Sequence, residues 1–341
     1  MLEEFEKVKL TETHYLSIAF KENGIYFNEF IKAISNLKEK LSEKEFQIFW
    51  NDKIQLNKNT FNEKNYIQGA CEIAVANYFL NKTEFKVEVK VNPKNKKDVD
   101  CQFKSGKYIY NIEVKCASFD AKEIVQKSDS FKYQTLGRLN NKEELISIIS
   151  NAIDSGLTNQ GKELKVHSEL KNMDNNLKDF LESAHQKFNP ECIENEVNIL
   201  LICCDDKADM QSWVGYLTAS QGLFTRESYV DKSTYNNVDI VLLTNLYYKH
   251  KDFNHKNTSG SWNLNETLNL FIVNPFRAKD KKEGILNFQN EIINYNKEIS
   301  EFEVPGEAPT GVKESVRIPH FVIDYLENQN GIYLFDRKKT E

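Results

Sequence analysis

Hydrophobic and polar residues alternate with a period of two in two neighbouring stretches of the chain, 97–103 and 110–116. This alternation, together with residues that favour extended backbone, predicts a strand in each stretch. Ser105-Gly106-Lys107 between them has the composition of a tight turn, so the two strands are expected to form a β-hairpin. Side chains then alternate between two faces, which makes one face of the hairpin apolar and the other polar.

The polar face of this hairpin combines carboxylates with an amine. It would carry Asp98, Asp100, Gln102, Asn111, Glu113 and Lys115, and the apolar face Val99, Cys101, Phe103, Tyr110, Ile112, Val114 and Cys116. Two carboxylates held a few ångströms apart repel each other unless a cation lies between them. Mg²⁺ takes oxygen ligands of this kind, and such a metal can activate water and stabilise a phosphate under attack. Lys115 could orient or deprotonate that water.

Elements on both sides of the hairpin predict an α/β arrangement. The stretch 61–81 predicts a helix rich in small residues that carries Glu72, and 84–91 alternates like a strand with one wet face. Further on, short continuous apolar runs predict buried strands that extend a mixed sheet, at 198–204, 238–243 and 268–273. Up to residue 116 the pattern therefore predicts a helix followed by three strands.

The acidic residues and the lysine resemble the motif of the PD-(D/E)xK nuclease superfamily. In that family an acidic residue opens one strand, and a Glu or Asp, any residue and a Lys follow on the next. Here Asp100 is followed, after a gap of twelve residues, by Glu113-Val114-Lys115. The Gly-x-x-Glu spacing that ends at Glu72 is similar to the form seen in the junction-resolvase and exonuclease branches. The chain departs from the pattern in having no Pro directly before Asp98 or Asp100.

The resemblance implies a fold, a metal and a reaction. The fold would be a restriction-endonuclease-like mixed β-sheet core flanked by helices. Glu72, Asp100 and Glu113 would hold Mg²⁺ or Mn²⁺ with the backbone carbonyl of Val114, and Lys115 would position the attacking hydroxide. The expected activity is metal-dependent hydrolysis of phosphodiester bonds, in DNA rather than RNA. The implied setting is restriction or anti-phage defence first, and DNA repair or recombination second.

Other interpretations of these residues remain open. Asp98 shares a face with Asp100 and is the alternative metal ligand. Asp-x-Asp and Glu-x-Lys pairs also occur as ordinary solvated faces of antiparallel sheets. The chain could accordingly be a non-catalytic nucleic-acid-binding module or a partner subunit that keeps the nuclease scaffold.

The length of 341 residues and the spacing of the elements suggest three parts. Helical patches predict an N-terminal helical section at 1–60, in which the aromatic stripe is expected to be core. The nuclease core would cover 61–275 with a helical insertion at about 118–190, in which 154–176 is expected to be a polar loop. A C-terminal helix, expected at 284–302, and a small closing unit would follow from 276 to 341.

Charge and cysteine content bound the partners and the compartment. The net charge of −6 provides no global basic field for nucleic acid, so a protein partner or a homo-oligomer is expected to help. The stretch 82–107 nevertheless contains eight Lys, which could contact phosphates or protect a strand edge. Six Cys without a Cys-x-x-Cys pair favour free thiols in the cytoplasm. The acidic start is unlike a signal peptide, and no apolar run is long enough to span a membrane. We therefore expect neither a signal peptide nor a membrane partner.

Two further polar groups favour structural roles. Asp205-Asp206 follows an apolar run, and the pair is expected to cap the helix that begins next. His250 and His255 match no HExxH motif and are expected in a surface loop.

Overall fold

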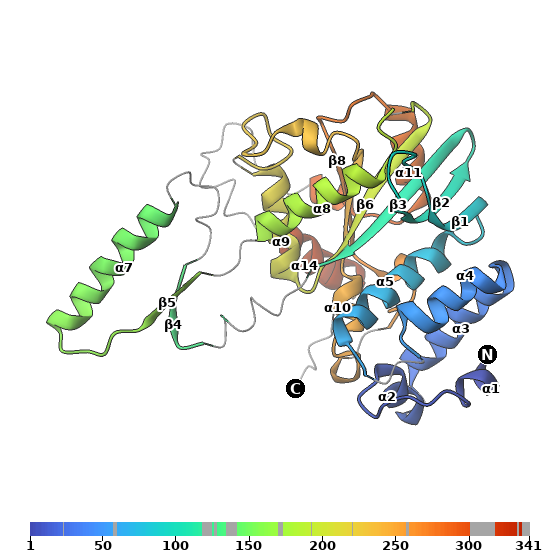
Figure 1. Ribbon diagram of the computed structural model, residues 1–341, viewed down its shortest axis with the longest axis horizontal. Helices are drawn as coiled ribbons and strands as arrows, with labels where there is room; N and C mark the ends of the chain where they lie inside the picture. Colours follow the sequence, from blue (N-terminus) through green and yellow to red (C-terminus); the bar gives the residue numbers. More distant parts are fainter. Residues whose placement is uncertain are drawn as a thin grey trace.

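A six-stranded mixed sheet forms the centre of the protein in a computed structural model (Figure 1). The structure describes residues 1–341 except 23, 57–59, 118–124, 126–127, 134–141, 170–172, 192, 220, 257–258, 301–317, 333 and 336–341. The strands, in their order across the sheet, are β1 (Thr83–Val89), β2 (Val99–Ser105), β3 (Tyr108–Cys116), β6 (Glu196–Cys203), β7 (Ile240–Thr244) and β8 (Asn269–Val273). The expectation of an α/β fold with a mixed sheet flanked by helices is confirmed.

The predicted hairpin is formed by β2 and β3. The two strands are antiparallel, with Cys101 opposite Ile112 and Ser105 opposite Tyr108. Gly106 makes the turn with a φ of 59°, a left-handed conformation that glycine adopts without steric cost. The alternation of the sequence fixes this register, because a slip by one residue would turn the apolar side chains away from the core.

The middle of the sheet is parallel and buried on both faces. β3, β6 and β7 run parallel, whereas β1 and β8 are antiparallel to their neighbours. Every residue of β6 after Glu196 is buried, and so is all of β7. Continuous apolar runs are what a strand needs when helices cover both of its faces, so the strands predicted from such runs are confirmed.

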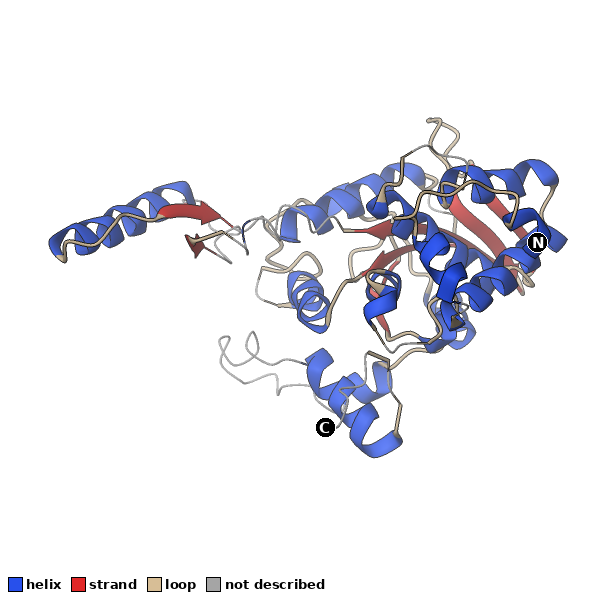
Figure 2. Cartoon of the chain, turned by 90° about the horizontal axis from the view of Figure 1, so that it is seen from below, coloured by secondary structure: helices blue, strands red, loops and turns tan. Residues whose placement is uncertain are grey.

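Helices cover the two faces of the sheet (Figure 2). The first face contacts α5 (Glu63–Phe79), α10 (Leu246–His250) and α11 (Lys282–Glu291), and on it Phe79 stacks on Phe103 with ring centroids 4.6 Å apart. The second face contacts α8 (Met173–Lys187) and α9 (Lys207–Thr218), and α14 (Ile318–Asn330) packs on α9. Short elements of this part of the chain are η2 (Lys232–Thr234), η3 (Phe253–His255), η4 (Leu264–Glu266) and α12 (Asn296–Ser300).

The N-terminal section is helical and packs on α5. It consists of α1 (Leu2–Phe5), α2 (Tyr15–Glu22), α3 (Ile25–Lys40), α4 (Glu43–Gln47) and the π-helical turn η1 (Ile48–Lys53). Phe46, Phe49 and Trp50 are buried, as expected for a core stripe. This packing places the end of η1 beside α5.

The inserted region differs from the sequence expectation. Instead of a polar loop over 154–176, α7 (Lys142–Asn159) continues to 159 and is followed by the strand β5 (Val166–Glu169). β5 pairs in parallel with β4 (Ser130–Tyr133) in a separate two-stranded sheet, which Figure 1 shows to one side of the main sheet. Strands of four residues with one or two apolar side chains have too little periodicity to be recognised from sequence.

Other local expectations have mixed outcomes. Asp206 caps α9 by accepting a hydrogen bond from the Asp209 amide, as predicted. The surface-loop prediction is wrong for His250, which is fully buried and bonded to the Tyr26 hydroxyl. The helix expected over 284–302 is interrupted between α11 and α12. No helix in the described ranges is both long and apolar enough to cross a bilayer.

Candidate active site

Asp100 lies where β2 and β3 separate. The paired register ends at Cys101 opposite Ile112, and one step further it would bring Asp100 opposite Glu113. There the Val114 amide donates a 2.6 Å hydrogen bond to Asp100 Oδ2. The carboxylate therefore replaces a main-chain acceptor of the ladder, which fixes its position relative to β3.

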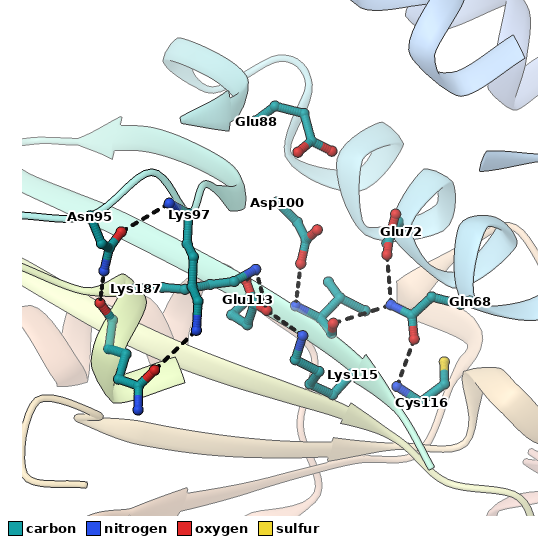
Figure 3. Close-up of polar contacts among 12 residues, drawn as sticks. Gln68, Glu72, Glu88, Asn95, Lys97, Asp100, Glu113, Lys115, Cys116 and Lys187 are labelled. Atoms are coloured by element: carbon teal, nitrogen blue, oxygen red, sulfur yellow. Dashed lines mark hydrogen bonds and ion pairs between the residues drawn. The ribbon is translucent and has the colours of Figure 1, made fainter. Parts of the chain in front are cut away.

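Glu72 is tied to the same strand through Gln68, which lies one helical turn earlier on α5 (Figure 3). Gln68 Nε2 donates to Glu72 Oε1 at 2.6 Å and to the Val114 carbonyl at 3.2 Å. Gln68 Oε1 accepts a 2.8 Å bond from the Cys116 amide. The side-chain amide of Gln68 thus bridges helix and sheet and brings Glu72 to the strand that carries the Glu-x-Lys motif.

An ammonium group lies among the carboxylates. Lys53 Nζ is 2.6 Å from Glu72 Oε2, 2.8 Å from Glu88 Oε1 and 4.0 Å from Asp100 Oδ1. Like charges so close together need a cation between them, and in this structure the lysine provides it. Glu72, Glu88 and Asp100 also line a small pocket together with apolar side chains of α5 and β3.

Three backbone irregularities place these groups. Lys53 ends the π-helical turn η1, a rare conformation that occurs often at functional sites. Gly69 lets η1 approach α5, since a Cβ there would lie 2.1 Å from the Lys53 carbonyl oxygen. Glu88 has a φ of 49°, a left-handed conformation that a residue with a side chain rarely adopts. Strain of this kind persists only where the surrounding structure imposes it.

Glu113 is paired with two lysines on the second face of the sheet. Its side chain is 0% exposed, and Lys115 Nζ and Lys187 Nζ both lie 2.6 Å from its Oε1. Lys115 follows on the same strand face, and Lys187 comes from the end of α8. Lys115 keeps 25% of its side chain exposed, so it does not point into the apolar interior.

The surroundings shift several of these pKa values. Burial raises the pKa of Glu72 to about 7, and the Asp100 charge adds to the rise against the opposing effect of Lys53. Burial likewise raises the pKa of Glu113 to about 7, again with a contribution from Asp100. Burial alone would lower the pKa of Lys53, but the charges of Glu72, Asp100 and Glu88 raise it. Lys53 therefore remains protonated at neutral pH.

The donor types, though not yet their spacing, suit a hard divalent ion, since in the described residues no three of these carboxylates gather as closely as ligands of one ion do. Carboxylate oxygens and a backbone carbonyl are the ligands that Mg²⁺ and Mn²⁺ prefer. Four carboxylates (Glu72, Glu88, Asp100, Glu113) face three ammonium groups (Lys53, Lys115, Lys187), so the fully ionised cluster carries 3 − 4 = −1. With one charge unbalanced and two carboxyl pKa values raised, additional positive charge would stabilise the cluster.

The structure brings the predicted residues into one neighbourhood in two groups. Glu72 and Asp100 share Lys53, Glu113 pairs with Lys115, and the Asp100–Val114 hydrogen bond joins the two groups. The alternative ligand Asp98 precedes β2, and no contact with the cluster is found for it in the described part of the chain. Gln126 and Gln134, the two candidates for the Gln that some branches of the resembled superfamily place after the motif strand, lie outside the described residues.

Sequence reasoning missed other members of the cluster: Lys53, Gln68, Glu88 and Lys187. Lys53 follows an aromatic stripe that reads as core, and Lys187 is one of many lysines on a polar helix face. One signal was available, a glycine (Gly69) inside a helical pattern. Glycine lowers the stability of a helix, so its presence there suggests that another segment packs closely against the helix.

Lysines of the basic stretch 82–107 are engaged at the sheet edge. Lys82 pairs with Glu291, Lys104 with Glu84 at 2.7 Å, and Lys107 with Glu283 at 3.1 Å. The order of strands makes β1 the edge of the sheet. These pairs offset part of the local positive charge, but Glu283 and Glu291 belong to α11, so Lys104–Glu84 is the pair among them that involves the edge strand.

Comparison with family models, with curated protein sequences and with solved structures yields no match for this chain.

Proposed function

We propose that this protein is a metal-dependent nuclease of the restriction-endonuclease-like fold that hydrolyses phosphodiester bonds in DNA. One observation carries the proposal: Glu72 from a helix and Asp100 from β2 surround a single cation, and Asp100 is hydrogen-bonded to the strand that presents Glu113 and Lys115. A solvated strand face would not explain why Glu113 is fully buried with two lysines.

Glu72, Asp100, Glu113 and the Val114 carbonyl are the groups that would hold Mg²⁺ or Mn²⁺. When bound, such an ion supplies a water of lowered pKa and neutralises charge that builds up on the phosphate. Gln68 orients Glu72 and contacts the Val114 carbonyl, so it keeps two of these donors in place.

The chain's own cations have separate roles in this proposal. Lys115, partly exposed beside Glu113, orients the attacking water and offsets the negative charge that builds up on the phosphate. Lys187 holds Glu113 from the other side, so Lys115 is not its only counter-charge. Lys53 keeps the carboxylates together in the absence of a divalent ion, and it competes with that ion for Glu72, Glu88 and Asp100.

Plasmid nicking tests the proposal. Purified wild-type protein is incubated with supercoiled DNA in Mg²⁺, in Mn²⁺ and in chelator, beside Asp100→Ala and Lys115→Ala. Nicking is expected only with metal, and each substitution is expected to lower its rate about 100-fold or more. Asp98→Ala is the matched control, since Asp98 lies two residues away and outside the cluster. It should cut like the wild type.

Two results would contradict the proposal. If the wild type and both alanine variants nick DNA at the same rate, the cutting activity comes from a contaminant or another site. If folded wild-type protein binds DNA in Mg²⁺ but never cuts it, the chain is a non-catalytic module on this scaffold. Loss of activity in Asp98→Ala with retention in Asp100→Ala would move the metal ligand to Asp98.

A further inference from the structure

A second cluster of metal-binding side chains lies next to the carboxylates and is made of sulfur alone. The Sγ atoms of Cys71, Cys116 and Cys203 all lie within 4.8 Å of one another. Cys71 and Cys203 are fully buried, and Cys116 is half-buried. Within the described residues, no His, Asp or Glu belongs to this group.

Three different elements place these thiols. Cys116 and Cys203 are the last residues of β3 and β6 and are direct neighbours in the parallel register. Cys71 comes from α5, which packs over β3. The positions are therefore set by the sheet and its covering helix, so the thiols are held together before any ligand binds.

The spacing suits a metal–thiolate centre. Zinc–sulfur bonds are about 2.3 Å long, so three sulfurs around one ion in a plane would lie about 4.0 Å apart. The observed limit of 4.8 Å requires each sulfur to move inward by well under one ångström. Thiolates select soft ions such as Cu⁺ and Zn²⁺, whereas Mg²⁺ takes oxygen ligands.

We propose that Cys71, Cys116 and Cys203 bind one thiophilic metal ion, Zn²⁺ or Cu⁺, at a site separate from the carboxylate cluster. Binding breaks three S–H bonds, releases three protons to solvent and forms three metal–sulfur bonds, and no electron is transferred. Cys116 is the least buried of the three residues. Three sulfurs complete the coordination of Cu⁺, and Zn²⁺ would take water as its fourth ligand.

Such an ion would connect the elements that carry the candidate active site. Cys71 directly precedes Glu72 on α5, and Cys116 directly follows Lys115 on β3. Metal bound to the folded protein would therefore hold α5 against β3 and raise the temperature of unfolding.

The test measures metal binding by the reduced, full-length protein without oxygen. Zn²⁺ and Cu⁺ are supplied separately, each in competition with a coloured chelator, and bound metal is counted after gel filtration. The wild type is expected to retain one equivalent of at least one of these ions and to gain thermal stability with it. Cys116→Ser, which alters the half-buried thiol, should lose at least tenfold in affinity.

Two matched variants keep the result specific. Cys204→Ser changes a buried thiol one residue from Cys203 whose sulfur is outside the cluster, and it should bind like the wild type. Asp100→Ala should also keep the metal even where it abolishes nicking, so failure of the nuclease proposal and failure of this one are separable. Equal binding by Cys116→Ser, equal loss in Cys204→Ser, or retention of neither ion by the wild type would overturn the proposal.

Discussion

Two groups of buried charges lie on different strands of the same sheet, and they are built differently. At the start of β7, Asp239 Oδ2 is 2.8 Å from Lys281 Nζ, and it also accepts a 2.8 Å bond from the Asn198 amide. One carboxylate meets one ammonium group, and the two side chains are only 1% and 2% exposed. This pair is balanced and closed to solvent, as expected of a structural ion pair.

In the carboxylate cluster around β2 and β3 the charges are not balanced, and the site is not closed to solvent. It has four carboxylates and three lysines, and Lys53 and Lys115 remain 22% and 25% exposed. Burial raises carboxyl pKa values in both places, for Glu72 and Glu113 in the cluster and for Asp239 in the pair, so the pKa shifts do not distinguish them. The comparison teaches that burial of charge alone does not indicate function. The proposed metal binding depends instead on the unbalanced charge and partial exposure of the carboxylate cluster, because a cation from outside would neutralise the excess negative charge.

The largest expected effect distinguishes the carboxylate cluster from the opposite end of the parallel strands by DNA-nicking activity. Glu113→Gln should lower DNA nicking about 100-fold or more, because a buried charge of the proposed metal site is lost. Glu196→Gln alters a carboxylate at the opposite end of the parallel strands and should leave the rate unchanged. Initial nicking rates at saturating Mg²⁺ measure both. Similar rates for the two variants would show that Glu113 matters no more to nicking than Glu196 does.

The closed pair should instead respond in stability. Lys281→Met leaves the buried Asp239 without its counter-charge, and it is expected to lower the free energy of unfolding by about 3–5 kcal/mol. Urea denaturation followed by circular dichroism measures this loss. Adding Asp239→Leu removes the unpaired charge and should recover part of it. A single variant as stable as the wild type would show that the pair is not the structural element described here.

The approach of η1 to α5 can be broken at one position. Gly69→Ala puts a Cβ where the Lys53 carbonyl lies, and it should cost about 1–3 kcal/mol of stability and lower the nicking rate. Gly156→Ala on α7 is the control, because a Cβ there meets nothing within 4 Å. It should stabilise the helix by up to about 1 kcal/mol. Equal stabilities of the two variants would contradict the close approach.

A third kind of buried charge is a lysine for which no ion pair is found in the described part of the chain. Lys249 donates to the Ser259 carbonyl, and burial lowers its pKa from 10.5 to about 8 despite the charges of Glu266 and Glu29. The folded state then binds fewer protons than the unfolded state between pH 8 and 10.5, so stability should rise with pH across that window. Lys249→Met should flatten this rise and stabilise the protein at pH 7 by about 1–3 kcal/mol. Denaturant midpoints at pH 7, 8, 9 and 10 measure both effects, and parallel curves would refute the assignment.

The parts of the structure that follow from the sequence are those with local patterns. Alternation along 97–103 and 110–116 predicts the hairpin and its apolar face. Apolar runs predict β6, β7 and β8 because a strand buried on both faces needs no polar side. Asp206 is recognisable as a helix cap from its position alone.

The remainder depends on contacts between distant segments. Lys53 and Lys187 reach the carboxylates from helices whose sequences carry no sign of the destination. His250 reads as a loop residue because Lys249, Lys251 and Asp252 surround it, yet its imidazole is packed against Trp262 and bonded to Tyr26. Tertiary packing decides both cases, and no local pattern reports it.

The cluster draws its members from positions that span 53 to 187, and β3 gains its parallel neighbour only with β6, at 196–203. A chain emerging from the ribosome therefore displays the Glu-x-Lys strand well before α8 and β6 exist to hold it. Translation that stops early would release a fragment with the motif but without its support. Under the proposed function, the chain therefore cannot cut DNA until α8 and β6 have been made.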